Sequence, residues 1–155
     1  MKHMMVVGLF LSIAVSSQEL VDSMSYNEKA MEWRTFVTDG PVSAFSPRGK
    51  DLWYATDAAT GLLDMKTNKK QIFPSLGEIA PAGVTSIAID KSGKAWFGTP
   101  QGIAVTADGK SFKAYTEKEG LVNNTVNTIF SRKDGTMWIG TEGGVSVFDN
   151  GTWKS

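Results

Sequence analysis

The chain has 155 residues, with 16 basic and 16 acidic side chains, one histidine and no cysteine. This is the length of one domain or part of one, and a hydrophobic content of 41% is enough to build a buried core. The lack of cysteine excludes disulfides, thiolate zinc sites and thiol catalysis. A formal net charge of zero argues against a nucleic-acid-binding surface, which usually makes a domain strongly basic.

The first 17 residues have the pattern of a secretory signal peptide. Lys2 and His3 precede a 12-residue apolar run that ends at Val15, and small residues follow. This run is too short to cross a membrane as a helix, and its flanks fit cleavage after Ser16 or Ser17. We therefore expect export to the periplasm or to the outside of the cell, and a mature chain without histidine.

Residues 18–32 form a polar leader before the first apolar segments. Ser25 and Glu28 have the spacing of a capping box, which predicts a short helix near residues 26–32. From Trp33 onward, short apolar segments alternate with Gly, Asp, Asn and Pro turns, and this alternation indicates strands.

A repeat of about 42 residues organises the rest of the chain. The segments 93–99 (GKAWFGT) and 135–141 (GTMWIGT) are 42 residues apart, and an earlier copy lies at 49–56 (GKDLWYAT). Glycine and aspartate mark hairpin turns between the apolar segments of each unit. In the middle unit we expect four strands, at 84–90, 95–99, 103–106 and 112–115.

Four antiparallel strands that recur every ~40–45 residues are typical of a β-propeller blade. We therefore predict an all-β fold with about three blades, in a partial ring or in a ring completed by oligomerisation. The expected segments are a stray outer strand at 33–40, blades at 41–82 and 83–121, and an incomplete blade at 122–155 that lacks its fourth strand.

The segments 84–105 (VTSIAIDKSGKAWFGTPQGIAV) and 122–148 (VNNTVNTIFSRKDGTMWIGTEGGVSVF) resemble the two-component regulator propeller repeat. That family's motif is a hydrophobic strand, an Asp-Gly turn, a W-[IF]-G-T core, a Gly-rich turn and a second hydrophobic strand. The resemblance covers about residues 33–155 and is weaker in the first unit, where residues 54–56 (YAT) replace the core. Such arrays are often periplasmic sensor regions of signalling histidine kinases, so the resemblance implies a sensing role.

Several repeated residues point to the framework rather than to a ligand site. Trp53, Trp96 and Trp138 recur at one strand position, so we expect them to fill the wedge between neighbouring sheets. Gly98 and Gly140 are expected to allow a close approach within a strand. The Asp-Gly pairs lack the alternating oxygen side chains of a calcium loop, and we expect neither a metal ion nor a cofactor.

Loops in an antiparallel blade alternate between two edges. We call one the long-loop edge (38–41, 57–60, 74–83, 100–102, 116–124 and 142–144) and the other the tight-turn edge (47–51, 66–70, 90–94, 107–110, 132–135 and 149–151). The long-loop edge carries six acidic side chains and one basic, and the tight-turn edge carries ten basic and five acidic. Long loops on a rigid scaffold often have functional roles. We therefore predict binding at the long-loop edge, by Asp57, Gln101, Glu117, Asn123, Asn124 and Glu142.

The sequence favours an exported, non-catalytic module that binds or senses a small molecule, a glycan or a protein partner. A structural or assembly role is the first alternative. An enzyme resembling the propeller streptogramin lyase would need histidine with a metal, and the mature chain has no histidine. A carboxylate-dependent hydrolase would have to pair Asp57 with Glu142, whose equivalent in the middle unit is Pro100.

Three units do not close a ring, since propellers have typically 4–8 blades. Residues 33–37 have the pattern of the strand that we expect the last unit to lack. Two chains could therefore exchange this strand and form a six-bladed homodimer. A truncated, open fragment is the alternative.

Overall fold

The computed structural model describes residues 38, 40–79 and 83–154. The signal peptide, the short helix near residues 26–32 and the strand at 33–37 lie outside these residues. Within the described part of the chain, no helix has the length and apolar character needed to span a membrane.

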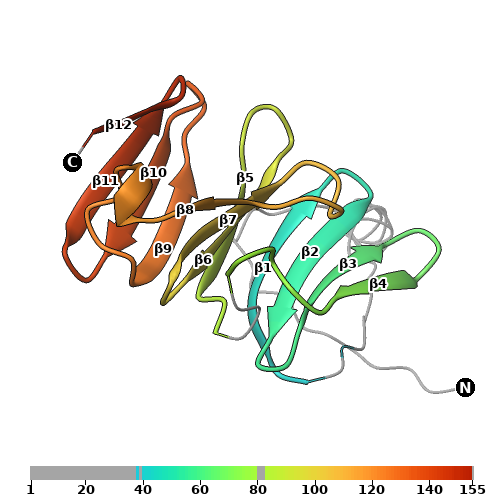
Figure 1. The fold of residues 1–155 in the computed structure, drawn as a ribbon. Coiled ribbons are helices and arrows are strands. Elements are labelled where there is room, and N and C mark those ends of the chain that lie inside the picture. Colours follow the sequence, from blue (N-terminus) through green and yellow to red (C-terminus); the bar gives the residue numbers. More distant parts are fainter. Residues whose placement is uncertain (1–37, 39, 80–82, 155) are drawn as a thin grey trace, which may run out of the picture. The chain divides into compact units, whose positions relative to one another are not determined.

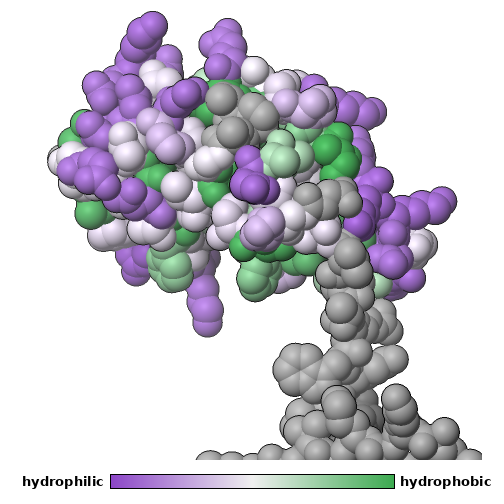
Figure 2. All heavy atoms as spheres, turned by 90° about the horizontal axis from the view of Figure 1, so that it is seen from below, coloured by the Kyte–Doolittle hydropathy of each residue, from purple (hydrophilic) through white to green (hydrophobic). Residues whose placement is uncertain are grey.

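The described residues form three four-stranded antiparallel sheets, each with the topology of a propeller blade (Figure 1). The prediction of an all-β fold built from such blades is confirmed. Figure 2 shows hydrophobic residues between hydrophilic ones on one face of the molecule. Blade 1 contains β1 (Val42–Arg48), β2 (Asp51–Thr56), β3 (Thr60–Asp64) and β4 (Lys69–Phe73). Blade 2 contains β5 (Ser86–Ile89), β6 (Ala95–Thr99), β7 (Gly102–Thr106) and β8 (Lys113–Tyr115). Blade 3 contains β9 (Val126–Ser131), β10 (Met137–Thr141), β11 (Gly144–Asp149) and β12 (Thr152–Lys154).

The last blade has four strands, so the prediction of an incomplete blade at 122–155 is wrong. β12 pairs with β11 through Val147↔Lys154 and Asp149↔Thr152. Asn150 and Gly151 both have positive φ, at 47° and 88°, which is the geometry of a two-residue hairpin turn. The chain therefore reverses at once and three residues suffice for the strand. Blade 3 consequently needs no strand from residues 33–37 of a second chain.

Blades 1 and 2 share one hydrophobic core. Because side chains alternate across a strand, each sheet has a leading face towards the preceding blade and a trailing face towards the following one. The trailing face of blade 1 contributes Trp53 and Leu62, and the leading face of blade 2 contributes Ile87, Phe97 and Ala104. The Trp53 and Phe97 rings meet edge to face with their centroids 5.3 Å apart.

Blades 2 and 3 repeat this packing in a second core. Trp96 and Val105 from the trailing face of blade 2 pack with Ile129 and Ile139 from the leading face of blade 3. A hydroxyl crosses each interface at the same place in the repeat. Ser43 Oγ donates to the Val84 carbonyl at 2.9 Å, and Thr85 Oγ1 donates to the Val126 carbonyl at 2.7 Å. The blades are thus stacked trailing face on leading face.

The three repeated tryptophans do not share one environment. Trp53 and Trp96 are buried, but Trp138 is 40% exposed, so it does not fill a wedge between sheets as predicted. It lies on the trailing face of blade 3, and no further sheet follows among the described residues. A Cβ on Gly98 would lie 2.7 Å from Val126 Cγ1, whereas one on Gly140 would lie 2.8 Å from Thr128 Cγ2. Gly98 therefore permits the close contact between blades 2 and 3.

Candidate functional site

The connection between β8 and β9 is the longest segment of the long-loop edge that is described without a gap. It spans residues 116–125 and includes a short 3-10 helix, η1 (Glu117–Glu119). Strand direction alternates within each blade, so the turns that follow β2, β6 and β10 lie at the same edge. Among the described residues, the long-loop edge thus combines this connection with several tight turns.

A complete capping box fixes the start of η1. The Thr116 hydroxyl accepts a hydrogen bond from Lys118 N, and the Glu119 carboxylate accepts one from Thr116 N at 2.7 Å. Hydrogen bonds from the Thr116 hydroxyl and amide hold the pKa of Glu119 below its usual range. Gly120 ends η1 with a φ of 110°, in the left-handed region that favours glycine.

Glu117 and Asn124 tie the two ends of this connection together. Glu117 N donates to Asn124 Oδ1 at 2.8 Å, and Asn124 N donates to Glu117 Oε1 at 3.0 Å. Glu117 is exposed and Asn124 is half-buried. The reciprocal bonds therefore hold both side chains at the surface in a defined geometry.

The turn after β10 lies against the same connection. A Cβ on Gly143 would lie 2.7 Å from Asn123 Cβ, and Glu142 N donates to the Thr125 carbonyl at 3.0 Å. Glu142 Oε1 accepts a hydrogen bond from Asn127 Nδ2 at 2.9 Å. Four of the six predicted binding residues are thus gathered in one place: Glu117, Asn123, Asn124 and Glu142, which we call the blade-3 cluster.

The other two predicted residues lie on other blades. Gln101 is in the β6–β7 turn of blade 2, where its backbone N donates to Thr99 Oγ1 at 3.0 Å. Asp57 follows β2 in blade 1. Asp57 is in blade 1 and Glu142 is in blade 3, so two sheet-to-sheet spacings of about 10 Å each separate them. This distance exceeds the roughly 5–9.5 Å between the paired carboxylates of glycosidases. The structure does not bring this candidate hydrolase pair together.

The blade-3 cluster offers carboxylate and amide groups, which accept and donate hydrogen bonds. Such groups suit a hydroxyl-rich or cationic ligand. Among the described residues, no three histidine, aspartate or glutamate side chains are grouped so that they could hold a metal ion.

Carboxylates at the tight-turn edge stabilise the turns themselves. Asp90 Oδ1 accepts hydrogen bonds from Ser92 N and Lys94 N, and Asp90 Oδ2 accepts one from Trp96 Nε1 at 3.0 Å. Burial opposes the ionisation of Asp90, but the bonds from Ser92 and Trp96 hold its pKa below the usual range. The pKa of Asp134 is likewise lowered, by hydrogen bonds from the Thr136 amide and hydroxyl.

Ion pairs also occur at the tight-turn edge. They join Arg48 to Asp51, Lys50 to Asp64, Arg132 to Asp134 and Lys154 to Asp149. Part of the basic charge predicted for this edge is therefore balanced locally.

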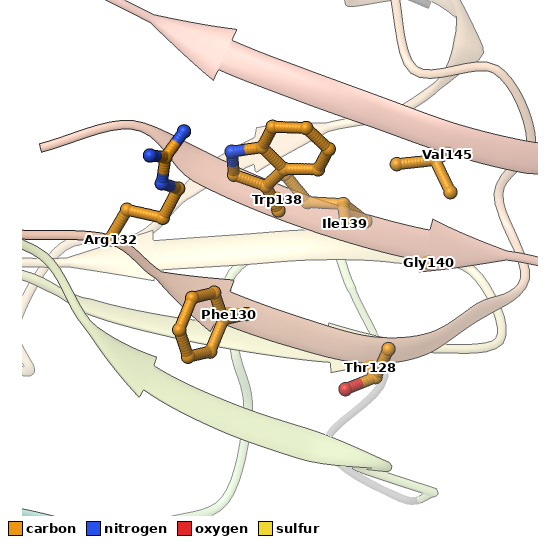
Figure 3. A pocket seen from close by; sticks show the side chains of 7 residues that line it. All are labelled: Thr128, Phe130, Arg132, Trp138, Ile139, Gly140 and Val145. Atoms are coloured by element: carbon orange, nitrogen blue, oxygen red, sulfur yellow. The ribbon is translucent and has the colours of Figure 1, made fainter. Parts of the chain in front are cut away.

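An apolar groove on the trailing face of blade 3 was not predicted from the sequence. The groove has a volume of about 510 Å³ and is lined mainly by side chains of β9, β10 and β11 (Figure 3). Phe130 and Trp138 face each other across neighbouring strands, and the Arg132 guanidinium lies 5.9 Å from the centre of the Trp138 ring. Repetition alone predicted a core position for Trp138, because the pattern does not reveal that no further sheet follows blade 3 among the described residues.

Comparisons with known proteins agree with this architecture. Residues 120–143 match the family model described as two component regulator propeller. This match confirms the resemblance of the segment to that propeller repeat. The segment contains the β8–β9 connection from Gly120 onward and the W-I-G-T core of β10. No curated protein matched the chain.

Solved structures with a similar fold include large extracellular domains from B. thetaiotaomicron. One belongs to a proposed hybrid two component system and has a TM-score of 0.65 and 24% identity, covering 83% of this chain and 19% of that chain. Another, from a proposed one component system, has a TM-score of 0.62 and 19% identity, covering 79% and 17%. Virginiamycin B lyase from Staphylococcus aureus has a TM-score of 0.59 and 17% identity, covering 76% and 41%. At these identities the likeness shows the fold, and the chain spans less than a fifth of the two extracellular domains.

Proposed function

We propose that this chain is a non-catalytic, sensor-type binding module that acts outside the cytoplasm. The blade-3 cluster is the observation that carries the proposal. It lies within and beside the segment that matches the two component regulator propeller model. The two extracellular domains with a similar fold are from proposed signalling systems, and the leader pattern of residues 1–17 supports export.

The long-loop edge is the proposed binding surface, and its ligand is hydroxyl-rich or cationic. The side chains of Glu117 and Asn124 each accept a hydrogen bond from the backbone amide of the other residue. These side chains are therefore already ordered, and binding costs little conformational entropy. The remaining acceptor and donor atoms of the blade-3 cluster point to polar recognition rather than to bond cleavage. Virginiamycin B lyase, which shares the fold, provides the competing interpretation of an enzyme.

A titration of the isotopically labelled chain tests this proposal. The probes are a panel of neutral mono- and disaccharides and small organic ammonium ions, followed by backbone chemical shifts. We expect the shifts to change at residues 117–124 and at Glu142. Shift changes confined to residues 91–94 and 132–135 would place binding at the tight-turn edge and contradict the proposal.

Glu142→Ala is the matched binding variant, because within the part of the chain that the structure describes its carboxylate bonds to the exposed Asn127 side chain alone. We expect it to weaken binding by roughly tenfold, as for the loss of one hydrogen bond to a charged group. Lys110→Ala, at the opposite edge, should leave the affinity unchanged. Equal affinities for the wild type and Glu142→Ala would exclude the blade-3 cluster as the site.

A further inference from the structure

A pocket of mixed character lies between blades 2 and 3 at the tight-turn edge. It has a volume of about 350 Å³, and small-molecule pockets have volumes of about 300–1,000 Å³. Blade 2 contributes most of its lining, and β11 of blade 3 contributes Phe148. The lining combines aromatic rings with charged groups and includes Asp90, Lys94, Trp96, Lys113, Tyr115 and Phe148. None of these residues belongs to the blade-3 cluster.

The equivalent place between blades 1 and 2 is filled. Arg48 crosses from blade 1 to blade 2, where its Nη1 donates to the Gly93 carbonyl at 2.8 Å. The connection between β7 and β8 folds back onto blade 1, since a Cβ on Gly109 would lie 2.6 Å from Phe73 Cε1 and 3.2 Å from Trp53 Cη2. An arginine and a turn thus close this interface at the tight-turn edge, and Phe73 is buried.

The arginine contact does not recur between blades 2 and 3. Asp90 follows Arg48 at the repeat spacing of 42 residues, but its carboxylate accepts hydrogen bonds from its own hairpin turn and from Trp96 Nε1. Lys91 does cross to blade 3, where its Nζ lies 3.4 Å from the Asp134 carbonyl, but it does not line the pocket. The space that Arg48 occupies in the first interface therefore stays open in the second.

The turn between β11 and β12 is also shorter than its counterpart in blade 2. It contains Asn150 and Gly151, whereas residues 107–112 connect β7 and β8. A Cβ on Gly151 would have no neighbour within 4 Å among the described residues, so this turn does not pack on blade 2. Tyr115, the equivalent of the buried Phe73, consequently stays half-buried.

Three aromatic rings form the apolar part of the pocket. Trp96 and Tyr115 are stacked with an angle of 3° between their planes and with centroids 5.7 Å apart. The Phe148 ring lies 5.1 Å from Trp96 and 5.4 Å from Tyr115, centroid to centroid. Aromatic rings favour a further ring in an offset-stacked or edge-to-face arrangement. This part of the pocket therefore suits a flat aromatic ligand.

Two exposed lysines give the pocket its charge. Lys113 Nζ lies 4.7 Å from the centre of the Tyr115 ring. Neither Lys113 nor Lys94 forms an ion pair with a carboxylate of the described residues. The acidic residue of the lining, Asp90, already accepts hydrogen bonds from four donors of blade 2. The pocket thus offers an anion two ammonium groups that have no carboxylate partner in the described part of the chain.

We propose that this pocket binds a small aromatic carboxylate. The flat ring of the ligand packs against Tyr115 and Phe148, and its carboxylate pairs with Lys94 and Lys113. The long-loop edge is proposed to bind a hydroxyl-rich or cationic ligand. The inference therefore concerns a second ligand of different charge, and it does not depend on the first.

The test is a titration of the isotopically labelled chain with phenylacetate, phenylacetamide and acetate. Phenylacetate has both the ring and the charge, whereas phenylacetamide has only the ring and acetate only the charge. We expect phenylacetate to cause saturable shift changes at the Trp96 indole Nε1–H, at residues 111–115 and at Phe148. The other two probes should bind at least roughly tenfold more weakly, because each lacks one of the two contacts. Equal affinity for either of them, or phenylacetate shifts that leave these residues unchanged, would overturn the proposal.

Lys94→Gln and Lys113→Gln each remove one ammonium group from an exposed side chain, so the fold should be unaffected. Each should weaken phenylacetate binding roughly threefold, as for one exposed ion pair, and the double variant roughly tenfold. Phenylacetamide binding should not change. Lys133→Gln, which alters an exposed lysine of the same edge outside the pocket, is the matched control and should bind phenylacetate as the wild type does. An unchanged affinity in the double variant, or an equal loss in Lys133→Gln, would refute the proposal.

Discussion

At the scale of single residues, the three repeated tryptophans show how strongly one side chain depends on its neighbours. Trp96 is stacked on Tyr115, with ring centroids 5.7 Å apart, and it donates to Asp90. Trp138 has the same place in its strand, but its indole contacts Arg132 at the edge of an open groove. Equal positions in the repeat therefore do not imply equal contributions to stability.

We expect Trp96→Ala to lower the free energy of unfolding by about 3–5 kcal/mol, as for other buried aromatic truncations. Trp138→Ala should cost less than about 1 kcal/mol, because much of its indole is already in water. Urea unfolding of the two variants and of the wild type measures these losses. Similar losses for the two variants would show that Trp138 is buried in the single chain.

The two strand glycines allow a second comparison, at the scale of the blade interface. Gly98→Ala would bring a methyl group against the buried Val126 of the next blade, whereas Gly140→Ala would meet Thr128 beside the open groove. We expect thermal unfolding to give a loss of about 1–3 kcal/mol for Gly98→Ala, as for overpacking of a core, and a clearly smaller loss for Gly140→Ala. The reverse order would contradict the packing of blade 2 on blade 3.

The carboxylates of the hairpin turns and of η1 should make stability depend on pH in the acid range. Hydrogen bonds and ion pairs lower the pKa values of Asp64, Asp90, Asp108, Glu119 and Asp134 in the folded chain. A lowered pKa contributes stability above the unfolded value of about 4, and this contribution is lost as the pH falls through the folded value. The free energy of unfolding should therefore be constant near pH 7 and decrease steadily below about pH 4.

Urea unfolding at pH 7 and pH 3 measures this dependence. Asp108→Asn keeps a side-chain oxygen for Lys110 N but does not ionise, so it should lose less stability on acidification than the wild type. A stability that rises on acidification would mean that the turn carboxylates are not held in their charged form by the fold.

Most elements of the fold could be predicted from local sequence, because strand alternation and turn glycines act over a few residues. The expected strand at 95–99 coincides with β6, and the other strands of the middle unit differ only at their ends. β12 was missed as a paired strand, because three residues are too few to show alternation. Its register depends instead on the Asn150-Gly151 turn and on the packing of Trp153 against Phe148.

At the scale of the whole molecule, the alternation of loops between the two edges predicted that the candidate residues lie on one edge. It could not predict which of these residues contact one another. The contact between Asn123 and the β10–β11 turn joins segments about 20 residues apart, and it depends on how β9 pairs with β10. The groove beside Trp138 was not predicted for a similar reason. The exposure of Trp138 depends on whether another sheet packs on blade 3, and the sequence of the repeat itself does not contain that information.

The repeats stack trailing face on leading face, and the trailing face of blade 3 is exposed at Trp138. Hydrogen exchange of the indole Nε1–H groups tests this packing, with each signal assigned by Trp→Phe substitution. We expect slow exchange at Trp53 and Trp96, which are buried, and fast exchange at Trp138. Trp138 protected as well as Trp96, or fast exchange at Trp53, would contradict it.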